Sequence, residues 1–511
     1  MEAVLTRKNL IVKSVGLLAI LALVKAVFGL GKDLVIARYF GATWQADVIL
    51  AVLSVVMVLF WTLGSALESA FIPEYLKKSV INKDKARLKS TSFFMTVLII
   101  TSIVTIALIL LAPLYVKLLF PGFNQEAIDL ATNLLRGFLV LLVLQTLFLV
   151  LKGFYHAERN FIKPAIVAIV SSLAIIAMVI IFQERLGAYS VMWGFIIGSL
   201  IQISLLLKNG VKGRFNWNQL VNDWPWLKSV WKLAWPLFIA TLFIQFNFVV
   251  DRIFASNLAT GSISSLTYSF RVIQLPLDLF GVALFTVMLP ILASSVVIKN
   301  FDQYKKDFGT ALNLIFLVII PLSILMMFFA KPLVQIIFQR GAFDSAATLQ
   351  TASALVFYLL GLVFMTLTFL TERALQSLQK VKIFLYINLL TFLVNIGLDF
   401  GLSKIWGVKG IALATSIVYA ISVIWQLRIL HRQIPDLLVK ANFRILGKVI
   451  IASSVMLSGL ILVNAGLFVF DTINAYSMTR LIIQIIFSLY VYYIVMRLMK
   501  IDIIKLVRHR I

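Results

Sequence analysis

Cysteine is absent from the sequence, histidine is rare and acidic residues are few. The lack of cysteine excludes disulfide bonds, thiol catalysis and sites that bind zinc or iron–sulfur clusters through thiolates. The three histidines, His156, His431 and His509, lie far apart in the chain, which argues against a metal-dependent active site. No glycine-rich phosphate loop of the Walker type occurs, so nothing in this chain uses ATP as a driving force. These absences predict a protein that is not an enzyme.

Charged residues make up only 13% of the 511 residues, whereas hydrophobic residues make up 61%. A soluble protein of this composition would have too little polar surface to stay in solution. Many apolar runs reach the length of about 20 residues that a helix needs to cross a bilayer. Because a helix satisfies its own backbone hydrogen bonds in lipid, we predict an all-α integral membrane protein.

Apolar windows predict about fourteen membrane-spanning helices. They cover residues 10–31, 48–71, 92–118, 130–151, 164–182, 188–207, 232–250, 267–297, 310–330, 350–370, 383–402, 409–427, 446–468 and 478–499. The net charge of +25 comes from lysines and arginines that cluster in every second junction, such as 77–89 and 299–306. This alternation is typical of cytoplasmic loops and explains the charge better than nucleic-acid binding does. With Arg7 near one end and Lys505 near the other, both termini are predicted to be cytoplasmic.

The sequence resembles itself when it is shifted by 217 residues. The shift places Gly64, Ala66, Leu67 and Pro73 on Gly281, Ala283, Leu284 and Pro290, and Ala42-Thr43 on Ala259-Thr260. An even number of spans in each copy gives both copies the same orientation, so an axis along the membrane normal should relate them. We predict a six-helix lobe over residues 1–215, a second over 225–432 and an additional helix pair over 445–500. Two equivalent lobes with a substrate site between them are the layout of an alternating-access transporter.

The stretch from Tyr268 to Pro290 is apolar and as long as a membrane helix, yet it contains Arg271. A charge on a membrane helix costs about 2.5 to 3.5 kcal/mol on insertion scales, so it is retained where it faces water or a partner. Pro276 and Gly281 predict a bend or close packing within the stretch. We predict that Arg271 meets an anion in an aqueous cavity, and the alternative is an ion pair with Asp278.

Several stretches resemble the MurJ/MviN family of lipid II flippases, within the superfamily of multidrug, oligosaccharidyl-lipid and polysaccharide exporters. They are KDLVIARYFGATWQAD (Lys32 to Asp47), LLRGF (Leu134 to Phe138), GFYHAERNFIKPA (Gly153 to Ala165), the block from Asp251 to Pro290, and RALQSLQKVK (Arg373 to Lys382). The resemblance implies fourteen helices, two lobes and a C-terminal helix pair that forms a groove for a lipid tail. It also implies transport of an undecaprenyl-pyrophosphate-linked sugar from the inner to the outer leaflet.

The chain departs from the family pattern at two places. Where the family typically has S-R-x-L-G-x-x-R-D near the first helix, this chain reads KAVFGLGKD, with Lys25, Ala26 and Lys32 at the serine and two arginine positions. The family's arginine pair late in the second helix is absent, because that region reads VLFWTLGS. These departures leave two passengers open, lipid II and another undecaprenyl-linked glycan.

A pyrophosphate headgroup needs fixed cations and polar groups around it. The predicted substrate-binding residues are Lys25, Lys32, Arg38, Asp47, Arg136 and Arg271. For Lys32, Arg38 and Arg136 the alternative is a position at the outer membrane interface. Asp47 would either orient one of the cations or cap the N-terminus of its own helix.

Four further side chains form a candidate sodium site, namely Asp251, Asn395, Asp399 and Thr415. Asn395 and Asp399 are four residues apart and share a helix face. Two carboxylates, an amide and a hydroxyl suit a hard cation, and the membrane setting favours sodium over a divalent ion. The resemblance implies a similar sodium site on the same three helices, which would couple sodium influx to reorientation of the lobes. The alternatives are that Asp251 pairs with Arg252 or Lys404 and that Asn395 bonds a neighbouring helix.

We therefore predict a flippase of the bacterial inner membrane that moves lipid II by alternating access, driven by membrane potential or a cation gradient. The alternatives are a flippase for an O-antigen or capsule unit, a cation-coupled drug exporter, and a membrane glycosyltransferase. The last would need a large extramembrane loop with paired acids. Predicted partners are the lipid-linked glycan, membrane lipids and proteins of cell-wall synthesis, without nucleic acid. The amphipathic, basic stretch from Glu74 to Ser90 is expected to lie on the inner membrane surface against anionic lipid, and the alternative is a specific partner-binding role.

Overall fold

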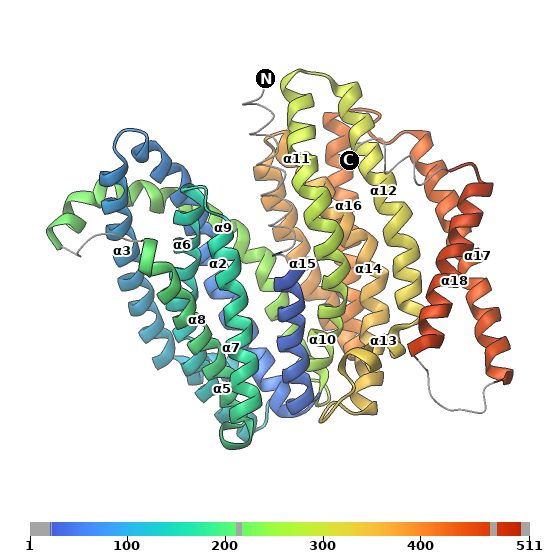
Figure 1. Ribbon diagram of the computed structural model, residues 1–511, viewed down its shortest axis with the longest axis horizontal. Coiled ribbons are helices and arrows are strands. Elements are labelled where there is room, and N and C mark those ends of the chain that lie inside the picture. Colours follow the sequence, from blue (N-terminus) through green and yellow to red (C-terminus); the bar gives the residue numbers. More distant parts are fainter. Residues whose placement is uncertain (1–20, 22, 211–216, 471–477, 502–511) are drawn as a thin grey trace. The chain divides into compact units, whose positions relative to one another are not determined.

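The computed structural model of the chain describes residues 21, 23–210, 217–470 and 478–501, and nearly all of them lie in helices (Figure 1). The basic residues near the termini, including Arg7 and Lys505, lie outside the described residues. Contacts divide the chain into two compact units. The first comprises Met1–Thr267 and Phe338–Ala347, and the second comprises Tyr268–Ile337 and Thr348–Ile511. The predicted lobe boundaries stay a prediction.

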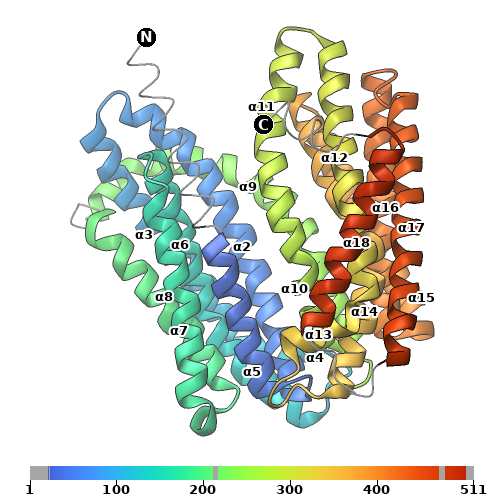
Figure 2. The same cartoon turned by 45° about the vertical axis from the view of Figure 1, so that its right-hand side comes forward.

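The first unit starts with a helix whose described part covers residues 23–40. The helices that follow are α2 (Trp44–Ser79), α3 (Lys83–Leu110), α4 (Ala112–Leu119), α5 (Gln125–Phe138), α6 (Val140–Ala157), α7 (Ile162–Leu186), α8 (Tyr189–Gly210) and α9 (Trp217–Ala255). α6 and α9 pack along α2, and α7 pairs with α8 in a hairpin. Figure 2 shows α7 and α8 side by side next to α6.

The second unit contains most of α10 (Ser262–Pro276), whose first turn belongs to the first unit. It continues with the π-helical turn η1 (Leu277–Gly281), α11 (Val282–Val297), α12 (Phe301–Phe328), α13 (Ala330–Phe338), α14 (Ser345–Ser377), α15 (Val381–Trp406), α16 (Val408–Gln433), α17 (Lys440–Phe470) and α18 (Met478–Leu498). The α17–α18 pair packs on α12, where Tyr492 donates a 2.9 Å hydrogen bond to the carbonyl of Leu317. Asn442 of α17 also contacts Asn313 of α12 at 2.9 Å.

Twelve helices in the described part of the chain are long and apolar enough to cross a membrane. The two other predicted spans are 10–31, whose first half lies outside the described residues, and 267–297, which η1 divides into shorter pieces. The predicted fold class is confirmed, and the expected number of spans is about right. The protein is therefore a multi-pass membrane protein.

Two helical hairpins, one in each unit, turn at a glycine with positive φ. Gly187 (φ 51°) joins α7 to α8, and Gly407 (φ 57°) joins α15 to α16. Each glycine donates its N–H at 2.8 Å to the carbonyl four residues earlier, Gln183 or Ser403. Glycine adopts this left-handed backbone without the steric cost that a side chain would add, so it can end one helix and start the next directly.

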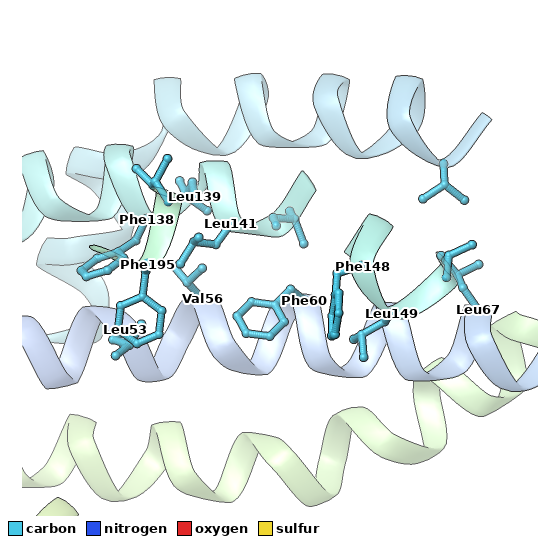
Figure 3. Close-up of a cluster of buried hydrophobic side chains, with 14 of the residues drawn as sticks. Leu53, Val56, Phe60, Leu67, Phe138, Leu139, Leu141, Phe148, Leu149 and Phe195 are labelled. Carbon is cyan, nitrogen blue, oxygen red and sulfur yellow. The ribbon is translucent and has the colours of Figure 1, made fainter. Parts of the chain in front are cut away.

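Large apolar side chains from α2, α5, α6 and α8 form the core of the first unit. Figure 3 shows Phe60 of α2 beside Phe148 of α6, both buried. Nearby, the rings of Phe138 and Phe195 meet edge to face at 5.9 Å. Interlocking rings of this size pack to the density of an organic crystal, so the first unit is a rigid scaffold for the polar groups at its ends.

The stretch from Glu74 to Ser90 comprises the end of α2, a short turn and the start of α3. α2 continues to Ser79, the chain turns, and Asn82 begins α3 by accepting a 2.9 Å hydrogen bond from the N–H of Lys85. Asparagine is a strong N-cap residue, so it starts a new helix here. The expected position of this stretch on the inner membrane surface stays a prediction.

Candidate functional site

Arg271 lies on α10, one and a half turns before the regular helix ends. Pro276 closes α10, and η1 follows it at once over Leu277–Gly281. Proline has no N–H to give to the helical ladder, which explains a change of hydrogen-bond pattern at this place. The irregularity predicted between Pro276 and Gly281 is therefore present. π-Helical turns inside α-helices are frequent at functional sites.

The side chain of Arg271 is half-buried, while its neighbours Tyr268, Val272 and Ile273 are buried. The packing of these neighbours fixes the rotation of α10 and thus the direction in which Arg271 emerges. Asp278, the alternative partner for Arg271, is exposed and accepts a hydrogen bond from the amide of Gln274 at 3.4 Å. Binding of a phosphorylated passenger by Arg271 stays a prediction.

The other predicted cations have different surroundings. Lys25 and Arg38 are exposed on the first helix, and Arg136 is exposed on the last turn of α5. Lys32 is largely enclosed, because its ammonium group lies 3.2 Å from the carboxylate of Asp33 and 5.2 Å above the ring of Phe195. Its charge is thus balanced within the first unit, a contact that the sequence interpretation did not consider.

Asp47 does not cap its own helix, although that was one of its two predicted roles. Thr43 is the N-cap of α2. The carboxylate of Asp47 instead accepts hydrogen bonds from the N–H of Gly261 at 2.7 Å, the N–H of Ser264 at 2.7 Å and the hydroxyl of Ser264 at 2.8 Å. These N–H groups open α10, where the helix dipole favours a negative charge. Asp47 therefore anchors the helix that carries Arg271.

Two contacts between loops lie near Asp47, one between Gly41 and Ala342 and one between Gly122 and Ser256. We call Asp47 together with these two contacts the Asp47 end of the first unit. The N–H of Ala342 donates to the carbonyl of Arg38 at 2.8 Å. A Cβ on Gly41 would lie 2.2 Å from the carbonyl oxygen of Ala342. A Cβ on Gly122 would lie 2.1 Å from that of Ser256. Glycine is thus required on one side of each contact. In each contact, a loop from one sequence copy meets a loop from the other.

The opposite end of α2 is held by ionised side chains, and we call it the basic end. The carboxylate of Glu158, in the turn after α6, binds Lys83 at 2.9 Å and Arg87 at 3.0 Å and also accepts a hydrogen bond from Tyr75. Burial raises the pKa of Glu158, but the hydrogen bonds from Lys83, Tyr75 and Arg87 outweigh it, so the pKa lies below its usual value. Glu158 therefore stays ionised and ties α2, α3 and α6 together.

Glu68 is a further acidic residue that the sequence interpretation missed. It lies on α2 between Lys152, at 2.9 Å, and Nδ1 of His156, at 3.2 Å, both on α6. A glycine at position 153 makes room for it, because a Cβ there would lie 3.0 Å from Cγ of Glu68. An acid inside an apolar helix was the signal available in the sequence, since such a charge needs a partner.

Three of the four residues of the candidate sodium site lie in the second unit. The amide of Asn395 donates to the carboxylate of Asp399 at 2.9 Å, and both side chains are buried on α15. Thr415 is buried on the adjacent α16 and donates to the carbonyl of Ile411 at 3.2 Å, which leaves its lone pairs for a cation. A carboxylate, an amide and a hydroxyl at these places fit a hard cation in chemistry.

Asp251, the fourth residue of that set, lies in the first unit. Its carboxylate is 3.8 Å from the guanidinium of Arg252, which also donates to the carbonyl of Phe248 at 2.9 Å. The alternative partner considered for Asp251 is therefore present. The four-residue sodium site stays a prediction.

Comparison with known proteins decides the family. The sequence profile of the family described as lipid II flippase MurJ matches residues 36–486. The chain belongs to the MurJ family. A probable lipid II flippase MurJ of Thermotoga maritima is 30% identical over 395 residues, which are 77% of this chain and 80% of that protein. One from Buchnera aphidicola of the host Acyrthosiphon pisum is 26% identical and matches 93% of both chains.

Solved structures agree with this assignment. A lipid II flippase MurJ in an inward closed conformation is similar with a TM-score of 0.81 and 26% identity, covering 94% of this chain and 98% of that one. An inward-facing multidrug transporter of the MATE family has a TM-score of 0.70 at 14% identity and covers 82% of this chain and 98% of its own. At that identity the second likeness shows the fold alone. The MurJ fold thus holds Arg271, Asp47 and the Asn395–Asp399 pair.

Proposed function

We propose that this protein is a flippase of the bacterial inner membrane that moves lipid II from the inner to the outer leaflet by alternating access. The observation that carries the proposal is the match of the MurJ family to residues 36–486. The basic end faces the cytoplasm, because lysine and arginine concentrate in cytoplasmic loops. Both termini would lie on the cytoplasmic side as well. Transport of lipid II makes and breaks no covalent bond, so in this proposal the protein is not an enzyme.

Arg271 is the residue that we assign to the pyrophosphate of the passenger. A guanidinium is charged at every physiological pH and can give two parallel hydrogen bonds to a phosphate. Its helix begins at the N–H groups bound by Asp47 and changes geometry at η1. A movement of α10 would therefore move a fixed positive charge, and transport requires that the passenger bind the two states with different affinity. Lys25, exposed on the first helix, is the second assigned cation.

Membrane potential or sodium supplies the direction of transport in this proposal. An elementary positive charge that crosses the membrane toward the negative side is stabilised by about 2.3 kcal/mol for each 100 mV of membrane potential. This energy is enough to bias the equilibrium between two conformational states. The Asn395–Asp399 pair with Thr415 is the place where sodium would act, since these residues offer oxygen ligands in a buried position.

Complementation tests the proposal. A strain depleted of its own lipid II flippase should grow when it produces this protein, and Arg271→Ala should fail to support growth at equal membrane abundance. Arg185→Ala is the matched control, because Arg185 is an exposed arginine in the last turn of α7. Equal growth with Arg271→Ala would remove Arg271 from the substrate site.

Another undecaprenyl-linked glycan is the remaining alternative passenger, because the first helix carries Lys25, Ala26 and Lys32 where the family typically has serine and two arginines. A well-expressed wild-type protein that does not rescue the depleted strain, but restores surface glycan in an O-antigen flippase mutant, would favour it. Proteins of cell-wall synthesis remain proposed partners. A cation-coupled drug exporter finds support only in the shared fold of the MATE transporter.

A further inference from the structure

Each unit presents an apolar pair at the tip of a helical hairpin. In the first unit, Val80 and Ile81 form the turn between α2 and α3 and are 87% and 79% exposed. In the second unit, Val297 ends α11 and Ile298 follows it in the turn before α12, and they are 81% and 68% exposed. The shift of 217 residues that defines the sequence repeat places one pair on the other. Exposed aliphatic residues in a group require an explanation, because water is a poor solvent for them.

Both tips are ordered by backbone hydrogen bonds. The N–H of Asn82 donates to the carbonyl of Lys78 at 3.0 Å, and that of Asn300 donates to the carbonyl of Ser295 at 2.9 Å. The side chains of Asn82 and Asn300 then cap α3 and α12 by accepting from Lys85 and Gln303. The exposure of the apolar pairs is therefore a property of the folded turns.

Behind each tip, the second helix of the hairpin is fastened to its own unit. Arg87 of α3 binds Glu158, which follows α6. Tyr304 of α12 donates to the carbonyl of Ala374 in α14 at 3.1 Å. Position 304 corresponds to position 87 in the repeat. Each unit thus holds its tip in a fixed orientation.

The length of the helices sets the depth of the tips. From Trp44 to Ile72, α2 extends for about 43 Å at 1.5 Å per residue, which equals the thickness of a bilayer with its headgroups, about 40–45 Å. The next residue is Pro73, and Pro290 holds the corresponding place in α11. Prolines inside helices permit kinks, so the last two turns can run along the surface instead of away from it.

Basic residues surround both apolar pairs. Lys77, Lys78, Lys83 and Lys85 flank the first pair, and Lys299, Lys305 and Lys306 flank the second. Aliphatic side chains beside lysines are typical of segments that bind the interface of an anionic membrane, where the basic residues are attracted to the negative surface potential.

We propose that the two tips are anchors for the anionic lipid of the inner leaflet, with Val80–Ile81 and Val297–Ile298 inserted among the headgroups and the lysines on phosphates. A lipid surface explains the duplication better than a protein partner does. The basic residues around each tip assign each one separately to the cytoplasmic surface, whereas a single asymmetric protein would not need the same apolar pair twice. The anchors serve each unit separately and do not depend on which glycan is carried.

Site-specific labelling tests the anchors, because the chain has no cysteine of its own. Val80→Cys and Val297→Cys are each labelled with an environment-sensitive fluorophore in nanodiscs of phosphatidylcholine, with or without phosphatidylglycerol. Both labels should show blue-shifted emission that brominated lipid quenches, more strongly when phosphatidylglycerol is present. Glu126→Cys, at an exposed position on α5, should keep a water-like spectrum. Unchanged thermal midpoints of the unlabelled variants show that the fold is kept.

A water-like spectrum at the tips in phosphatidylglycerol nanodiscs would overturn the proposal, and a shift only after addition of soluble bacterial extract would assign the tips to a protein partner instead. The lysines have their own test. Lys78→Gln with Lys85→Gln in the Val80→Cys background should abolish the effect of phosphatidylglycerol, whereas the two Lys→Arg changes should retain it. An effect that persists with glutamine would contradict the role given to the lysines.

Discussion

The two ends of the first unit are held together by different means. At the Asp47 end, a buried carboxylate binds backbone N–H groups, and Gly41 and Gly122 meet carbonyl oxygens where no side chain would fit. At the basic end, Glu158 and Glu74 bind lysine and arginine side chains that are partly in water. Buried hydrogen bonds to backbone are costly to break, whereas exposed ion pairs are weak and screened by salt. The basic end is therefore the easier one to rearrange.

Of the changes considered, replacement of Gly41 at the Asp47 end should lower the stability of the protein most. Gly41→Ala places a Cβ 2.2 Å from the carbonyl oxygen of Ala342, at a residue whose φ is +60°. Overpacking and left-handed strain together predict a loss of about 3 kcal/mol or more of stability, read from thermal unfolding in detergent. Gly397→Ala is the matched control, because no atom lies within 4 Å of its added Cβ. It should be neutral or slightly stabilising. Equal losses in both variants would refute the close contact.

Removal of the Asp47 carboxylate should come next in size. Asp47→Ala leaves the N–H groups of Gly261 and Ser264 without their acceptor, and a buried unsatisfied group costs about 1–3 kcal/mol. We expect a lower unfolding temperature and faster hydrogen exchange in the first turn of α10. Asp302→Ala, an exposed acid in the first turn of α12, should have little effect. Unchanged exchange at Ser264 would show that Asp47 does not anchor α10.

At the basic end, Glu158→Gln should cost about 1–2 kcal/mol, because an ionised acceptor of several hydrogen bonds is replaced by a neutral amide. The pKa of Glu158 is lowered in the folded protein, so its stabilisation is present above the usual value of 4.5 and is lost as the pH falls through the folded value. The difference in stability between wild type and Glu158→Gln should therefore shrink below about pH 4.5. A difference independent of pH would mean that the charge of Glu158 is not responsible.

The smallest effect is expected for Lys77→Ala. Lys77 binds Glu74 at 2.7 Å, but its side chain is mostly in water. An exposed pair of this kind contributes about 0–1 kcal/mol, so unfolding should change by no more than that and less at high salt. A loss as large as that of Asp47→Ala would show that the two ends do not differ in the way described.

Much of the fold could be predicted from the sequence. Long apolar runs predict the membrane-spanning helices, and the alternation of basic and non-basic junctions predicts on which side of the membrane each loop lies. The repeat also placed Asp47 on position 264. What it could not predict is that these equivalent residues touch, since contact depends on how the helices pack. Lys32 was assigned to the passenger from its charge alone, and its pairing with Asp33 and Phe195 became visible only in the packed structure. The sodium-site residues were chosen by chemistry, and the hydrogen bond between Asn395 and Asp399 became visible only in the packed structure.

The most direct test of the account measures lipid II translocation itself. Purified protein in proteoliposomes, with fluorescent lipid II and an impermeant quencher, reports the rate at which the headgroup changes leaflet. Wild type should translocate lipid II, and Arg271→Ala should be strongly slowed while it unfolds at the wild-type temperature. Translocation at the wild-type rate by Arg271→Ala, or none by the intact protein, would contradict the account.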